Sequence, residues 1–159
     1  MTFAAAYEDP PLVWGVGRVA GADGVVPWPV SPRDIEDEAA TVAPRLAALG
    51  LGDGGLVLIV SLLSQAIHVV PLEQAAGLVG ARYSSADATP FDAFRTVSLV
   101  RQLQPAVVLG IDHRVCDGID ELGHDLADIF AAVGVVVAAD SDAATRLTAA
   151  GIDPGRWIR

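Results

Sequence analysis

The chain has 159 residues, 52% hydrophobic and 19% charged, and its ten arginines against twenty acidic residues give a formal charge of −10. This length suits one domain, which buries about 68–70% of its unfolded surface without needing disulfides. Because the chain is acidic and has no lysine, it is a poor partner for nucleic acid or anionic membrane surfaces, and it excludes Schiff-base, P-loop and receiver-type lysine chemistry.

The first thirty residues are rich in glycine and proline, and they predict a β-rich N-terminal arm, residues 1–30, ahead of a single α/β domain, residues 31–159. The segment Ala22–Gly24 between valine-containing runs predicts a hairpin turn. Gly15–Ala20 also matches the Gly-x-Gly-x-x-Ala dinucleotide fingerprint. That fingerprint should open a helix, whereas Asp23-Gly24 and two prolines follow within ten residues, so the hairpin is favoured.

From Ser31 onwards, helix and strand patterns alternate. Ser31–Asp34 joins an N-cap serine, a proline at the first helical position and a carboxylate, and it predicts a helix to Gly50 that Pro44 kinks or splits. Thr89–Asp92 repeats this signature and predicts a helix that ends before Pro105. The other expected elements are strand Leu56–Val60, helix Ser64–Val79, strand Ala81–Ala86, strand Ala106–Ile111, helix Val115–Val133, strand Val135–Ala138 and a helix from Asp140 to Gly151.

The segment Gly54–Leu72 carries no charge and approaches the ~20 residues that span a bilayer. Polar residues and Pro71 interrupt it, and β-branched residues crowd its first third, so we predict a strand and a helix there and no membrane span. The single cysteine, Cys116, and a start without the basic region of a signal peptide favour a cytoplasmic protein.

Four strands that alternate with helices of this length predict parallel pairing through right-handed crossovers. The expected fold is α/β: a three-layer, doubly wound, mainly parallel sheet of about four strands with an N-terminal β-hairpin arm. The tail Asp153–Trp157 is typical of a turn that carries an aromatic anchor.

Ligands in such sheets lie beyond the carboxyl ends of the strands. A carboxylate beside an imidazole, as in Asp112-His113, would tune a base near neutral pH. Neighbouring side chains rarely point at one another, however, so a loop with a capping aspartate and a solvated histidine is the favoured interpretation of this pair. Asp140, Ser141 and Asp142 follow the fourth strand. The candidate ligand-binding residues are Ser61, Ser84, Ser85, Asp87, Asp112 and His113.

Within the predicted helix 115–133, one continuous acidic face includes Asp120 and His124, whose spacing of four is that of helical metal sites. A structural zinc site needs four convergent ligands, and this face is typical of any surface helix of an acidic protein, so we expect no metal and no other cofactor. Cys116 shows no feature that would lower its pKa. The sequence also has no Gly-x-Ser-x-Gly elbow, no phosphate loop and no Cys-x-x-Cys pair, so no catalytic set can be assembled.

Several segments follow one another in a recognisable order: Leu49–Asp53, the strand Leu56–Val60, a helix that ends at Gly80-Ala81, and Leu103–Val108. Together they resemble the N-terminal subdomain of the adenylate-forming (AMP-binding) acyl-CoA synthetase/ligase superfamily, and Ser84–Asp92 is similar to the segment after the Gly-Ala step. The resemblance covers roughly residues 31–140. It implies that the phosphate loop, the adenine and ribose motifs and the catalytic lysine belong to parts of a ligase without a counterpart in this lysine-free sequence.

The resemblance therefore implies a stand-alone, truncated copy of the first subdomain, with no catalytic residues and no adenylation on its own. A second subdomain covers this one in a ligase, so a solitary copy should expose an apolar patch. We predict a non-catalytic module that self-associates or docks onto a protein of lipid, fatty acid or CoA metabolism. Two alternatives remain: a small enzyme or ligand-binding protein that uses Asp112, His113 and the Ser84–Asp87 loop, and the N-terminal fragment of a longer AMP-binding ligase.

Overall fold

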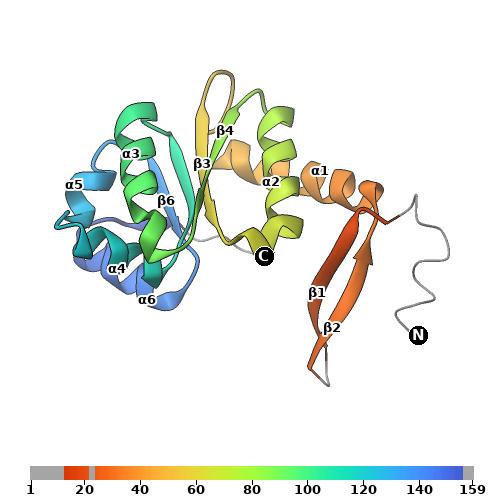
Figure 1. Ribbon diagram of the computed structural model, residues 1–159. Helices are drawn as coiled ribbons and strands as arrows, with labels where there is room; N and C mark the ends of the chain where they lie inside the picture. Colours follow the sequence, from red (N-terminus) through yellow and green to blue (C-terminus); the bar gives the residue numbers. More distant parts are fainter. Residues whose placement is uncertain (1–12, 22–23, 156–159) are drawn as a thin grey trace.

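The computed structural model describes residues 13–21 and 24–155, and it forms two separate sheets (Figure 1). The elements are β1 Gly15–Gly21, β2 Gly24–Val30, α1 Pro32–Ala48, β3 Leu56–Ser61, η3 Leu63–Gln65, α2 Ala66–Leu78, β4 Arg82–Asp87, η4 Pro90–Asp92, α3 Ala93–Leu103, β5 Val107–Ile111, α4 His113–Glu121, α5 Leu126–Phe130, β6 Val135–Ala138, α6 Ser141–Ala149 and β7 Pro154–Gly155.

The larger sheet has the order β4-β3-β5-β6-β7, and every neighbouring pair is parallel. From β3 the chain first moves outward to β4 and then crosses back to β5, so the strand order reverses between β3 and β5. This arrangement confirms the doubly wound α/β prediction. The sheet has one strand more than the predicted four, because the tail adds β7, whose Gly155 approaches β6 so closely that a Cβ would lie 2.9 Å from a methyl carbon of Val135.

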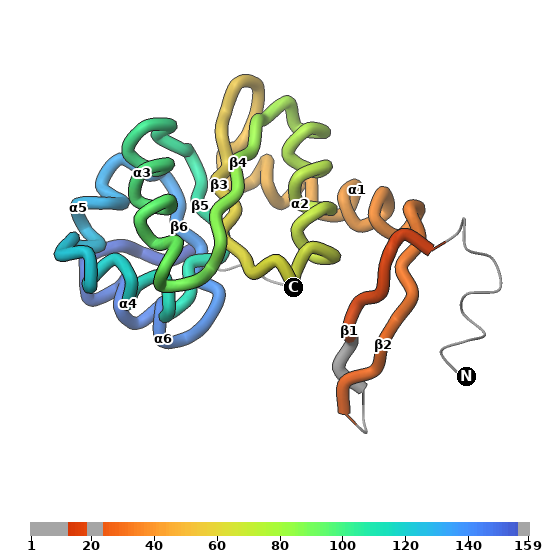
Figure 2. The backbone as a smooth tube through the Cα atoms, in the orientation of Figure 1, coloured from red at the N-terminus to blue at the C-terminus, as the bar shows by residue number. Residues whose placement is uncertain are grey.

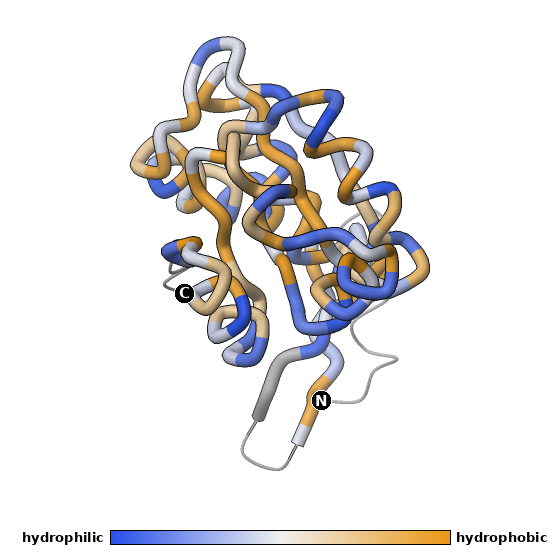
Figure 3. The backbone as a smooth tube through the Cα atoms, turned by 90° about the vertical axis from the view of Figure 1, so that its left-hand side faces the viewer, coloured by the Kyte–Doolittle hydropathy of each residue, from blue (hydrophilic) through white to orange (hydrophobic). Residues whose placement is uncertain are grey.

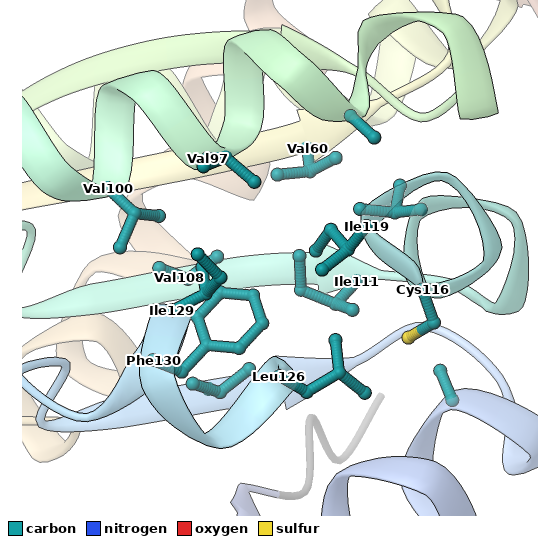
Figure 4. Packing of buried hydrophobic residues seen from close by; sticks show 14 of the residues in the cluster. Val60, Val97, Val100, Val108, Ile111, Cys116, Ile119, Leu126, Ile129 and Phe130 are labelled. Atoms are coloured by element: carbon teal, nitrogen blue, oxygen red, sulfur yellow. The ribbon is translucent and has the colours of Figure 1, made fainter. Parts of the chain in front are cut away.

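Helices cover both faces of this sheet. Successive residues of a strand point to opposite faces, and the buried residues accordingly divide into two clusters. Figure 3 shows stretches of hydrophobic residues running through the middle of the molecule. Val57 and Ile59 of β3 pack with α1 and α2, whereas Leu58 and Val60 pack with α3, α4, α5 and α6. Figure 4 shows this second cluster, which includes Val97, Val100, Val108, Ile111, Cys116, Ile119, Leu126, Ile129 and Phe130.

The predicted caps Ser31, Thr89 and Asp140 are confirmed. The backbone N–H of Asp34 donates to Ser31 Oγ at 3.1 Å, and the Asp34 carboxylate accepts the Ser31 N–H at 2.8 Å, which closes a capping box at α1. Pro44 lies inside α1 without splitting it, so that part of the prediction was wrong. Pro44 and Ala40 are both exposed, and the carbonyl that loses its partner is therefore open to water.

The prediction of one helix over Val115–Val133 was wrong. Gly123 has a φ of 74° and ends α4 in a Schellman motif: its N–H donates to Asp120 O at 2.8 Å, and the His124 N–H donates to Ile119 O at 3.1 Å. Asp125 then caps the separate helix α5 by accepting the Ala127 N–H at 2.8 Å. The acidic face is interrupted at this turn, and Asp120 and His124 do not share a helix.

Gly15–Ala20 lies in strand β1 of an antiparallel hairpin, so the Gly-x-Gly-x-x-Ala segment opens no helix. The turn residues Ala22 and Asp23 lie outside the described residues. The hairpin extends away from the larger sheet (Figure 2) and meets α2 where Gly17 is buried, since a Cβ there would lie 3.0 Å from Ile67. Among the described helices, none combines the length and the apolar character needed to cross a bilayer.

Candidate functional site

The parallel strands bring four of the six predicted site residues to the carboxyl ends of the strands. They do not bring the six together in one site. Ser61 ends β3, Asp87 ends β4, and Asp112 and His113 follow β5. Ser84 and Ser85 lie within β4, so the prediction of a Ser84–Asp87 loop was wrong. Ser85 faces α2, where its hydroxyl donates to Glu73 at 3.2 Å, and Ser84, one residue earlier in the strand, points to the opposite face.

Asp112 acts as a structural cap. Its side chain is buried, one carboxylate oxygen accepts the Val115 N–H at 3.0 Å, and the other accepts two bonds from the Arg114 guanidinium, one of them at 2.8 Å. Both oxygens are therefore occupied by residues of the first turn of α4. Asp112 and His113 do not face one another, and the carboxylate does not tune that imidazole through a hydrogen bond.

His113 instead pairs with Asp140, the N-cap of α6. Its Nδ1 lies 2.8 Å from Asp140 Oδ2, which also accepts the His113 backbone N–H at 3.1 Å. The hydrogen bond to Asp140 raises the pKa of His113. Burial by itself would raise the pKa of Asp140, but bonds from the Ala143 N–H and from the His113 ring and N–H outweigh it and lower that pKa to about 2.

This ion pair predicts a pH dependence of stability. Because the pKa of folded His113 is raised, its contribution is fully present below the ordinary value of about 6.5 and is lost as the pH rises through the raised value. We expect the unfolding free energy, measured by urea denaturation, to fall between pH 5.5 and 8.5 more in the wild type than in His113→Gln. An equal fall in both proteins would contradict the pairing. Below about pH 4, the Asp140 contribution should be lost in turn.

The switch point between β3 and β5, where doubly wound sheets bind ligands, is filled by close backbone packing. Gly110 sits at a register shift in β5, and a Cβ there would lie 2.1 Å from the Val60 carbonyl oxygen. Gly118 of α4 packs on η4, where a Cβ would lie 2.5 Å from Pro90 O. Since η4 follows β4 and α4 follows β5, this contact reaches across the end of β3.

An open groove of about 620 Å³ lies beside the switch point, between the start of α2 and η4. Three of the predicted residues, Ser61, Ser85 and Asp87, line it, whereas Ser84, Asp112 and His113 do not. Its other lining residues are Leu62, Leu63, Ala66, Val69, Val70, Glu73, Ala86, Thr89, Phe91, Asp92 and Arg95. We call these residues together the β4 groove.

Two of the polar groups of the β4 groove are held by Asp92. Asp92 accepts the Asp87 N–H at 2.8 Å and pairs with Arg95 Nε at 3.1 Å. Among the described residues, no hydrogen bond joins a serine or cysteine to a histidine, and no three metal-ligating side chains gather. Cys116 is buried, which raises its pKa to about 11 and keeps it a thiol at neutral pH.

Sequence reasoning missed Glu73, Phe91, Asp92 and Arg95 as groove residues. Its candidate ligand-binding residues were taken from the strands and the positions just after them, whereas these side chains come from α2, η4 and α3. For Phe91 a signal was present: it holds the place in Thr89–Asp92 that Arg33 holds in Ser31–Asp34, and both residues are exposed, Phe91 at 97%.

No protein-family model and no curated protein matches the sequence. Solved structures do match the fold. A 2-hydroxyisobutyryl-CoA ligase in its postadenylation state is 14% identical, with a TM-score of 0.67 over 90% of this chain and 31% of its own. The adenylation domain of a carboxylate reductase from Mycobacterium chelonae is 18% identical (TM-score 0.55; 88% of this chain, 24% of its own), and an anthranilate CoA ligase is 15% identical (TM-score 0.53; 80% and 23%).

These matches cover most of this chain and less than a third of each neighbour. This chain is therefore similar to one part of each ligase. The similarity shows how the backbone of this chain is arranged, and it assigns no active-site residue. The 159-residue sequence has the fold of a part of the AMP-binding acyl-CoA ligases, as the sequence resemblance implies.

Proposed function

We propose that the chain is a non-catalytic, ligase-like module that works by associating with another protein surface, either a second copy or a partner in CoA or lipid metabolism. One observation carries this proposal. Two large apolar side chains of the β4 groove project into solvent, Leu63 at 88% and Phe91 at 97% exposed, and Phe94 of α3 is 66% exposed. Gathered apolar exposure of this kind is typical of interaction sites in soluble proteins.

The absence of catalysis by this chain alone is supported by its chemistry. The sequence holds no lysine, and the resemblance places the phosphate loop and the catalytic lysine of the ligases outside the matching part. The small-enzyme alternative needed Asp112, His113 and the β4 residues to converge on a closed pocket. Asp112 and His113 instead bond to Arg114 and Asp140, and the β4 groove is open.

The coverage of 31% of the ligase chain favours a second candidate, in which this sequence is the first part of a longer AMP-binding ligase. Sequencing the reading frame beyond Arg159 distinguishes the longer ligase from the non-catalytic module. A glycine-rich, lysine-containing loop in that frame would support the longer ligase.

The proposal is tested with the purified chain in two assays. With ATP, CoA and a panel of carboxylic acids, we expect no pyrophosphate release above the protein-free blank. In sedimentation velocity, the fluorescently labelled chain should form a larger species, alone or in an extract of its native host. Leu63→Ser with Phe91→Ser should weaken that association at least about tenfold, because both side chains would lose apolar contact area. ATP-dependent thioester formation by the chain, or a monomer under both conditions, would overturn the proposal.

A further inference from the structure

We infer that the β4 groove binds a basic, amphipathic segment of a partner protein, and that its occupant is not a second copy of this chain. The inference rests on the proposed function and narrows it to one surface and one chemistry of partner. It is carried by the apolar lining of the groove, by the charges on its rim and by the hydrogen bonds of the edge strand.

The apolar part of the groove suits the hydrophobic face of a docked segment. Leu62, just after β3, and Ala66, Val69 and Val70 of α2 are half-buried, and they leave part of their surface open to the groove. Leu63 and Phe91 project from the η3 and η4 ends and are 88% and 97% exposed. Covering these two side chains removes from water the most exposed large apolar groups among the described residues.

The charged residues of the groove favour a partner with positive charge. Its lining holds three carboxylates, Glu73, Asp87 and Asp92, against one arginine, Arg95, which pairs with Asp92 at 3.1 Å. Glu73 and Asp87 form no ion pair within the described part of the chain, so two negative charges remain for a partner. Lysine or arginine side chains flanking an apolar stripe would complement them.

The same charges argue against a second copy. Each copy carries a formal charge of −10, and joining two such surfaces at an acidic rim brings like charges together. The negative charge of the chain attracts a basic segment, whereas it repels a second copy.

The edge strand β4 favours docking through side chains over addition of a further strand. On the side that pairs with β3, the Arg82 N–H donates to the carbonyl of Gly55, just before β3, and the Ala88 N–H donates to that of Ser61. The alternate residues Tyr83, Ser85 and Asp87 therefore turn their N–H groups to the open edge. The Asp87 N–H is already bonded to the Asp92 carboxylate at 2.8 Å. Capping this donor shortens the free edge to Tyr83 and Ser85, which is too short for a stable strand addition.

The test uses the full chain and two labelled synthetic peptides of equal length, LKKLLKLLKKLLKL and LEELLELLEELLEL, in fluorescence anisotropy at physiological salt. We expect binding of the lysine peptide and none of the glutamate peptide. Glu73→Gln with Asp87→Asn should weaken binding about fivefold, because each carboxylate gives a modest, screened attraction. The matched pair Glu121→Gln with Asp128→Asn removes the same charges from α4 and α5, and it should leave the affinity within about twofold.

A second pair of variants tests the apolar contact. Phe91→Ser should weaken binding about fivefold or more, whereas Leu78→Ser, at the other end of α2, should not. Equal losses in the groove and control variants would show general charge attraction and overturn the inference. If instead the chain dimerises and Phe91→Ser abolishes the dimer, the proposed function stands and the second copy replaces the basic partner.

Discussion

Replacing Gly110 by alanine should lower the free energy of unfolding by about 2–5 kcal/mol, the largest single-residue effect expected outside the core. Gly110 has a φ of 88°, and a Cβ would lie 2.1 Å from the Val60 carbonyl oxygen. The left-handed conformation costs an alanine about 1–2 kcal/mol. The clash adds a further ~1–3 kcal/mol, because β5 must move away from β3 while both strands are held by the core.

Gly151→Ala provides the matched control. Gly151 has a similar φ of 79°, but no atom would lie within 4 Å of its Cβ, so only the conformational cost of about 1–2 kcal/mol should appear. Urea denaturation of both variants separates the two contributions. Equal losses would mean that the close approach of β5 to β3 adds nothing to the free-energy cost, and that the register shift at Gly110 accommodates a Cβ without strain.

The helix starts could be predicted because their stabilising contacts are local. Ser31 and Asp34 are three residues apart and satisfy one another, and Thr89 caps η4 by accepting the Asp92 N–H at 3.3 Å. Asp140 caps α6 in the same way through Ala143 at 2.7 Å. Such pairs depend on the spacing of a few side chains, which is visible in the sequence.

The errors have a different cause. The break at Gly123 was visible as glycine followed by the cap residue Asp125, but the apolar periodicity of the segment continued through it and favoured one helix. Strand β7 is two residues long and exists only because Val136 and Val137 of β6 offer it a free edge. A pairing of this kind depends on residues far apart in the sequence, and no local pattern of Pro154-Gly155 predicts it.

The candidate site was predictable only in outline. The rule that ligands lie beyond strand ends correctly led to Ser61 and Asp87 as surface residues of one edge, and three of the six candidates line the β4 groove. The partner of His113 comes from another element, because Asp140 lies 27 residues further along the chain. The cap at Asp112 is instead a local contact, because its carboxylate accepts the Val115 N–H three residues further on, and the fold confirms the capping interpretation of this residue.

The packing of α4 on η4 links the stability of the fold to the shape of the groove. Gly118 is buried in α4, and a Cβ would lie 2.5 Å from Pro90 O and 2.6 Å from Ala93 Cβ. No side chain fits there unless η4 moves, and η4 carries Phe91 and Asp92, two lining residues of the β4 groove. A larger residue at this position should therefore disturb both.

Gly118→Val should lower the free energy of unfolding by about 1–3 kcal/mol through overpacking, and it should also weaken binding of the lysine peptide, although residue 118 does not line the groove. The control is Gly77→Ala in α2, where no atom lies within 4 Å of the added Cβ and the better helix propensity should stabilise the fold by about 0.5–1 kcal/mol. Urea denaturation and peptide anisotropy on both variants check this. A destabilised Gly118→Val protein that binds the peptide normally would show that η4 holds its position independently of α4, because overpacking would then have been absorbed by α4 alone.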